Sequence, residues 1–134
     1  MNTPGRQWFA VMIVVGFLYG VTGIVFALPS NNVRLWRLAA WVLSAALYAT
    51  HIGYERFRLG HSSLATASHA ATAVALGAFI LAGAATIHKA LATSPAPYSR
   101  FMLALVIWPL ITAVPAFLVA LVAGAVLTPL RRSV

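Results

Sequence analysis

The sequence predicts an all-α, polytopic integral membrane protein, built as a bundle of four transmembrane helices with short loops. Two observations support this fold class. Apolar residues make up 62% of the 134 residues and charged residues only 7%, whereas a soluble domain carries about 25% charged residues. The charges also fall between long uncharged stretches, and a helix needs about 20 such residues to cross a bilayer. Nine basic residues and one acid cannot cover a water-exposed surface, so a soluble globule is excluded, and the absence of cysteine excludes a disulfide scaffold.

The uncharged stretches place the four helices in one membrane domain, residues 1–134, at approximately 8–28, 35–53, 64–92 and 101–127. The second stretch is the shortest and reaches the required length only if Arg37 extends its side chain to the interface. Turn-forming residues at 29–32 and 94–97 predict two of the breaks, and segment 54–63, with Gly60 and three charges, predicts the middle loop. The apolar runs do not alternate with polar residues, which excludes a barrel.

The basic residues bear on orientation and partners. Four spans put both termini and the middle loop on one side, with five basic residues (Arg6, Arg56, Arg58, Arg131 and Arg132), against four on the other (Arg34, Arg37, Lys89 and Arg100). This excess of one favours cytoplasmic termini, and the near balance leaves insertion in both orientations open. Because these residues lie at helix ends rather than in one patch, we expect them to contact anionic lipid headgroups. Nucleic-acid binding is excluded.

Small residues predict where the helices pack. Lipid provides no hydrophobic drive for association, so close approach at small side chains marks the contact faces. The first helix has Gly16 and Gly20, and the fourth has Ala116, Ala120 and Gly124. A face left over after the bundle forms would serve a homo-oligomer or a partner in a larger membrane complex.

The fourth helix also contains Pro109 and Pro115, with Thr112 between them. Each proline removes a backbone donor and frees a carbonyl one turn earlier, which predicts a kink. Freed carbonyls near the middle of a membrane either ligate an ion or only mark a bend in the packing, and both interpretations remain open.

A polar stripe on the second helix carries the candidate site. Tyr48, His51 and Glu55 lie three or four residues apart, so they share one helical face. The next helix starts with a similar stripe that includes His69. Because the two helices are consecutive and antiparallel, we expect His51 and His69 at similar depth, with Glu55 and His61 closer to water.

Imidazoles and a carboxylate are ligands for a divalent transition metal, and imidazole also titrates near neutral pH. The candidate ion or proton site is therefore His51, Glu55, His69, His61 and Tyr48, and any metal would take His51, Glu55 and His69. The alternative is that Glu55 pairs with a neighbouring or terminal arginine while the histidines are hydrogen-bonded locally.

Three functions follow as hypotheses. The first is a small transporter or channel-like protein that uses the His/Glu site for protons or cations. The second is a non-catalytic accessory or scaffold subunit, and the third is an electron carrier with a haem between His51 and His69. The sequence requires no cofactor, although a transition metal or haem would fit these residue types. An enzyme is disfavoured because the sequence has no phosphate loop, no nucleophile elbow and no second acid to make a carboxylate pair.

Overall fold

The computed structural model describes residues 4–92 and 98–132, and over these residues the chain is helical and contains no strand. The all-α prediction is confirmed. Four helices, α1 (Pro4–Ala27), α2 (Val33–Gly53), α3 (Ser63–Leu91) and α4 (Tyr98–Arg132), follow one another, and a short π-helical turn, η1 (Tyr54–Arg58), extends α2. The predicted turn at 94–97 lies outside the described residues. The prediction of a loop from Tyr54 was wrong for its first half, because η1 continues the helix through Arg58.

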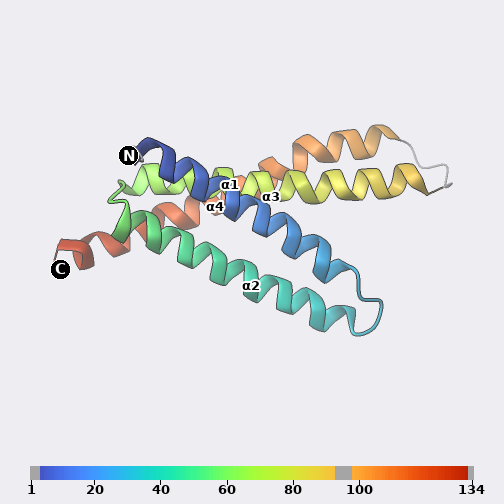
Figure 1. The fold of residues 1–134 in the computed structure, drawn as a ribbon, viewed down its shortest axis with the longest axis horizontal. Helices are drawn as coiled ribbons and strands as arrows, with labels where there is room; N and C mark the ends of the chain where they lie inside the picture. The colour runs from blue at the N-terminus through green and yellow to red at the C-terminus, as the bar shows by residue number, and fades with distance from the viewer. Residues whose placement is uncertain (1–3, 93–97, 133–134) are drawn as a thin grey trace.

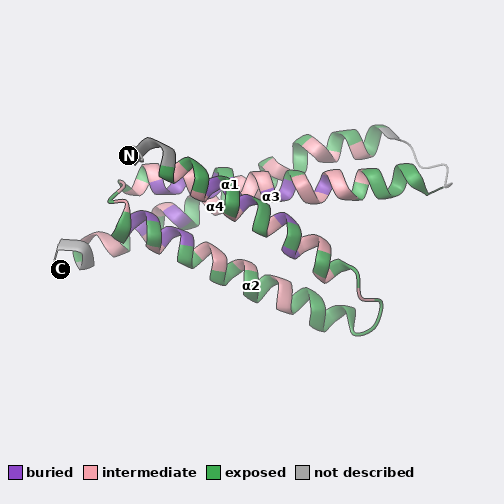
Figure 2. Cartoon of the chain, in the orientation of Figure 1, coloured by how far each residue is buried: buried purple, intermediate pink, exposed green. Residues whose placement is uncertain are grey.

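The helices run up and down, so that the start of α1, the η1 turn and the last turns of α4 lie at one end of the molecule (Figure 1). The α1–α2 turn lies towards the opposite end, where α2 leaves the other helices. Most of α2 is accessible, and its only buried residues are His51 and Ile52, close to η1 (Figure 2).

In the part of the chain that the structure describes, three helices are long and apolar enough to cross a membrane: α1 over Gln7–Ala27, α3 over Ser63–Leu91 and α4 over Ser99–Pro129. The uncharged stretches of the sequence predict four spans, and the fourth, α2, stays a prediction. α2 is less apolar than the other three, since it includes Arg34, Arg37 and His51 within its 21 residues.

Glycines determine how closely α1 and α3 approach. A methyl group added to Gly16 would lie 2.7 Å from Leu76 Cδ2, and one added to Gly20 would lie 2.6 Å from Ile80 Cγ2. On the facing helix, a methyl group at Gly77 would collide with the Cβ of Tyr19 and lie 3.0 Å from the Gly16 carbonyl oxygen. The α1–α3 contact therefore has no room for a side chain at these three glycine positions, as in the close contacts of small residues between membrane helices.

α4 packs along α3 through the second set of small residues. Ala120 is fully buried in a core with Ile52, Ala67 and Ala70, and a methyl group on Gly124 would lie 3.0 Å from Ser63 Cβ. Ala116 is half-buried. This core lies at the same end of the bundle as η1, where the buried residues concentrate (Figure 2).

The prolines of α4 do not interrupt it: the helix continues through Pro109, Pro115 and Pro129, and it curves along its length (Figure 1). The Thr112 hydroxyl lies 2.9 Å from the carbonyl oxygen of Trp108 and 3.1 Å from that of Pro109. It is thus engaged with its own helix.

Candidate functional site

The π turn determines how His61 meets Glu55. The Leu59 amide donates to the Tyr54 carbonyl at 3.2 Å, a five-residue step that widens the last turn of the helix. Gly60 then adopts a φ of 70°, in the left-handed region that glycine tolerates, and the chain reverses. The His61 amide donates to the Glu55 carbonyl at 3.1 Å. The backbone therefore folds His61 back over Glu55, and π turns of this kind are frequent at functional sites.

The start of α3 brings the third imidazole to the same place. Ser62 is the N-cap, and its side chain accepts a hydrogen bond from the Ala65 amide at 3.2 Å. α3 then runs antiparallel to α2, and His69 lies about two turns inside it.

These elements assemble a group of four side chains, Glu55, His51, His61 and His69, named here the Glu55 cluster. The Nδ1 atoms of His61 and His69 both contact Glu55 Oε2, and the distance from His69 is 2.9 Å. His51 approaches from the helical turn below, with its Nε2 3.6 Å from Glu55 Oε1. That distance is within ion-pair range but too long for a hydrogen bond.

The Glu55 cluster is closed to solvent at its centre and more open at its rim. The side chains of Glu55 and His51 have no exposed surface, whereas those of His61 and His69 are 24% and 18% exposed. Within the described residues, Glu55 Oε1 and both ring nitrogens of His51 have no hydrogen-bond partner. Buried polar atoms are rarely left unpaired, so these three atoms mark the cluster as a site with free capacity to bind a polar group or an ion.

The electrostatics keep Glu55 ionised. Burial alone raises the pKa of this carboxyl group, but the imidazoles of His51, His61 and His69 more than offset it, and the pKa falls from 4.5 to about 2. An ionised carboxylate only accepts hydrogen bonds, so the Nδ1–H groups of His61 and His69 must donate to it.

Two further side chains support the cluster. The indole of Trp8, from α1, stacks on the His69 ring with centroids 4.2 Å apart and planes 7° apart. Arg56 is 3% exposed, and its guanidinium donates to the His61 carbonyl and to the Thr128 hydroxyl of α4, both at 2.6 Å. All four helices therefore contribute to the cluster or hold it in place.

The structure separates the other candidate residues from this group. The Tyr48 hydroxyl donates to the Ala116 carbonyl of α4 rather than to Glu55. Thr112 lies about 24 Å along α4 from Thr128, far from the cluster. Glu55 pairs with three histidines and with neither Arg56 nor Arg58, so the alternative of a neighbouring arginine was wrong; the side chains of the terminal arginines lie outside the part of the chain that the structure describes.

Sequence reasoning did not include Trp8 or Arg56 in the site. For Trp8, nothing in a single sequence indicates that its helix face meets His69. Arg56 was expected near Glu55, but its contacts depend on the π turn, for which the sequence has no recognised signal. Glu55 is fully buried inside the bundle, and its expected depth, closer to water than His51, stays a prediction.

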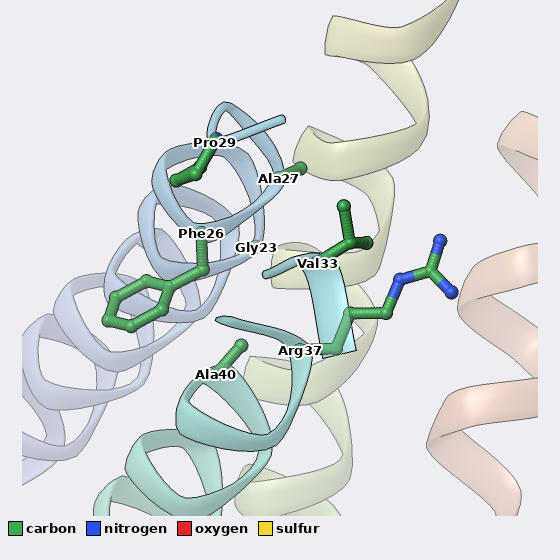
Figure 3. Close-up of a pocket in the computed structure, with 7 residues that line it drawn as sticks. All are labelled: Gly23, Phe26, Ala27, Pro29, Val33, Arg37 and Ala40. Carbon is green, nitrogen blue, oxygen red and sulfur yellow. The ribbon is translucent and has the colours of Figure 1, made fainter. Parts of the chain in front are cut away.

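A pocket of about 170 Å³ lies where α1 turns into α2, lined by Gly23, Phe26, Ala27, Pro29, Val33, Arg37 and Ala40 (Figure 3). Its one charged side chain, Arg37, extends away from α1 (Figure 3). The lining provides no acid–base pair or set of metal ligands, so the pocket offers no chemistry comparable to that of the Glu55 cluster.

Comparison with known proteins leaves these contacts as the basis for assigning a function. No protein-family model, no curated protein and no solved structure matches the chain.

Proposed function

We propose that the chain is a four-span membrane protein that passes a proton or another small cation, with the Glu55 cluster as its ion-binding site. The observation that carries this proposal is the burial of the only acid in the sequence against three imidazoles. Ionisable groups within membrane helices are costly to bury, and they commonly line ion pathways and proton relays.

The accessible surface of α2 supports a fourth span. Its 21 residues would extend about 31 Å, close to the thickness of the hydrocarbon core. Leu38, Trp41 and Val42 are 61%, 78% and 64% exposed, as expected for side chains that face lipid. Arg34 and Arg37 lie in the first turns of α2, from which their side chains can reach the headgroups.

With four spans, the Glu55 cluster and both termini belong to one side of the membrane. The excess of one basic residue on that side supports cytoplasmic termini. The cluster would then exchange its ion with the cytoplasm through the partly exposed rings of His61 and His69.

Buried polar groups continue from the cluster into the bundle and support a path for the ion. Thr66 on α3 is fully buried, and within the described residues its hydroxyl has no hydrogen-bond partner. The hydroxyl of the half-buried Tyr19 on α1 is also closed to solvent and has no hydrogen-bond partner among the described residues. Such atoms are typical partners of internal water, which can relay protons between them.

Flux into liposomes tests the proposal. Purified protein would be reconstituted, and proton uptake and uptake of divalent cations would be followed with dyes enclosed in the vesicles. We expect flux that Glu55→Gln abolishes and that His88→Gln, at the exposed far end of α3, leaves unchanged. Far-UV circular dichroism would establish that Glu55→Gln remains helical, and His51→Gln provides a second variant if it does not. Equal flux through wild type and both cluster variants would refute the proposal.

An accessory subunit is the second candidate, favoured by the position of α2. Most of this helix has few contacts with the rest of the bundle, which leaves room for a helix of a partner or of a second copy (Figure 2). This hypothesis predicts no flux, and it predicts that changing Trp41 and Val42 to Ala removes a co-purifying membrane protein or dissociates a homo-oligomer.

The haem hypothesis is disfavoured, because the Glu55 carboxylate occupies the space between His51 and His69 where the iron would lie.

A further inference from the structure

We infer that the Glu55 cluster is a binding site for a divalent transition-metal ion such as Zn²⁺, with His61, His69 and Glu55 as its protein ligands. The inference deepens the proposed function by naming the cation, and it depends on that function only for the role of the ion. Binding itself is argued from the donor atoms.

The three donor atoms are already close together. One ring nitrogen from each of His61 and His69 and a carboxylate oxygen of Glu55 lie within 4.8 Å of one another. Ligands at zinc-bond lengths in a tetrahedron are separated by about 3.3 Å. The 2.9 Å from His69 to Glu55 and the shorter His61 contact lie below that value, so the two rings would move slightly apart to admit an ion.

The donor types select the metal class. Two imidazoles and one carboxylate suit Zn²⁺ and its neighbours in the first transition row, whereas Mg²⁺ and Ca²⁺ require several oxygen ligands. Glu55 is the only acid in the chain, so the cluster has no second carboxylate for a hard cation. The ionised state of Glu55 supplies the negative charge that partly balances the ion.

His51 completes the argument from outside the ligand set. Its Nε2 faces Oε1, the carboxylate oxygen that the other two histidines do not contact, and both atoms lack a hydrogen-bond partner within the described residues. An ion held through Oε2 would draw the carboxylate towards the two rings and leave Oε1 for His51 to orient. Partners of this kind hold metal-bound carboxylates in place, and their loss costs about 10–100-fold in affinity.

Three protein ligands leave the fourth tetrahedral position open. Closed four-ligand sites are structural, whereas sites that exchange a ligand keep one position for water or an incoming group. The partly exposed edges of His61 and His69 lie on the solvent side of the cluster, so an ion can enter and leave past them.

A titration of the full-length protein in detergent, first freed of metal with a chelator, tests the inference. Isothermal titration with Zn²⁺ alone should give one ion per chain, with Mg²⁺ and Ca²⁺ giving no saturable heat. His61→Gln and His69→Gln should each weaken binding by more than about 100-fold, and His51→Gln by about 10–100-fold. The matched control, His88→Gln, should leave affinity unchanged. Intense visible bands with Co²⁺ in place of Zn²⁺ would report tetrahedral coordination.

The inference is overturned if Zn²⁺ binds without saturation, or if His61→Gln and His69→Gln bind it as wild type does. His61 lies in the turn before α3 and is partly exposed, so its variant should fold even if a variant of the buried Glu55 does not. Proton flux through a protein that does not bind zinc would overturn the metal site and leave the proposed function. Stoichiometric zinc binding with no flux of any ion would overturn the proposed function and leave the metal site.

Discussion

The contact between α1 and α3 allows a matched test of how the bundle is held together. Gly77 and Gly83 both lie in α3, but they differ in their surroundings. A methyl group at Gly77 would collide with Tyr19 Cβ and lie 3.0 and 3.2 Å from backbone atoms of Gly16 and Gly20, whereas one at Gly83 would meet no described residue within 4 Å. Backbone atoms cannot rotate away as a flexible side chain can, so Gly77→Ala must push the two helices apart.

The two substitutions share one favourable effect and differ in one unfavourable effect. Replacing a helical glycine with alanine favours the helix by about 1 kcal/mol. Overpacking a tight contact costs about 1–3 kcal/mol. We therefore expect Gly83→Ala to raise the free energy of unfolding by up to about 1 kcal/mol and Gly77→Ala to lower it by up to about 2 kcal/mol. The difference between these two changes in the free energy of unfolding measures the cost of overpacking the contact between α1 and α3.

Reversible unfolding in mixed micelles, with increasing sodium dodecyl sulfate and detection by far-UV circular dichroism, measures both variants. The reasoning is refuted if the two substitutions change stability equally, or if Gly77→Ala is as stabilising as Gly83→Ala. Either result would mean that α1 and α3 do not meet at these glycines.

Three further predictions concern the Glu55 cluster in metal-free protein. The folded-state pKa of Glu55 lies below its ordinary value. Its contribution to stability is therefore fully present above about pH 4.5 and is lost as the pH falls towards about 2. The free energy of unfolding, measured across this pH range, should show that loss in wild type and not in Glu55→Gln. Trp8→Leu removes the ring stacked on His69 and should lower the free energy of unfolding by about 1 kcal/mol. Thermal unfolding measures this difference, and an unchanged stability would contradict the stacking. Arg56→Gln should increase hydrogen exchange at the His61 amide, since the His61 carbonyl loses its guanidinium donor, while an unchanged rate would argue against that contact.

The sequence predicts the helices well because their signals are local. Uncharged stretches fix where the helices lie, to within a few residues at most ends, and the spacing of Gly16 and Gly20 identifies the face that meets α3. The end of α4 is less predictable. A proline such as Pro129 ordinarily marks the end of a helix, yet α4 continues to Arg132. A proline near the end of a helix loses only one hydrogen bond there, which a long helix tolerates.

The site is predicted in composition but not in geometry. Helical spacing brings His51 and Glu55 onto one face, and antiparallel succession brings His69 to the same end. The contact with His61 depends on the π turn, and the burial of Glu55 depends on how α3 and α4 pack against η1. Those are tertiary effects, and local patterns in one sequence do not encode them in a recognisable form.

The two hydrogen bonds of Arg56 link the end of α4 to the turn that carries His61. Thr128 lies near the end of α4, and the same guanidinium that holds its hydroxyl also holds the carbonyl of His61. α4 carries two prolines between Thr128 and its start, at Pro109 and Pro115, where bending is easier than in an unbroken helix. A tilt of the last turns of α4 would pull on Arg56 and shift His61 relative to Glu55. One guanidinium thus fixes the end of α4 and the turn that carries His61 relative to each other.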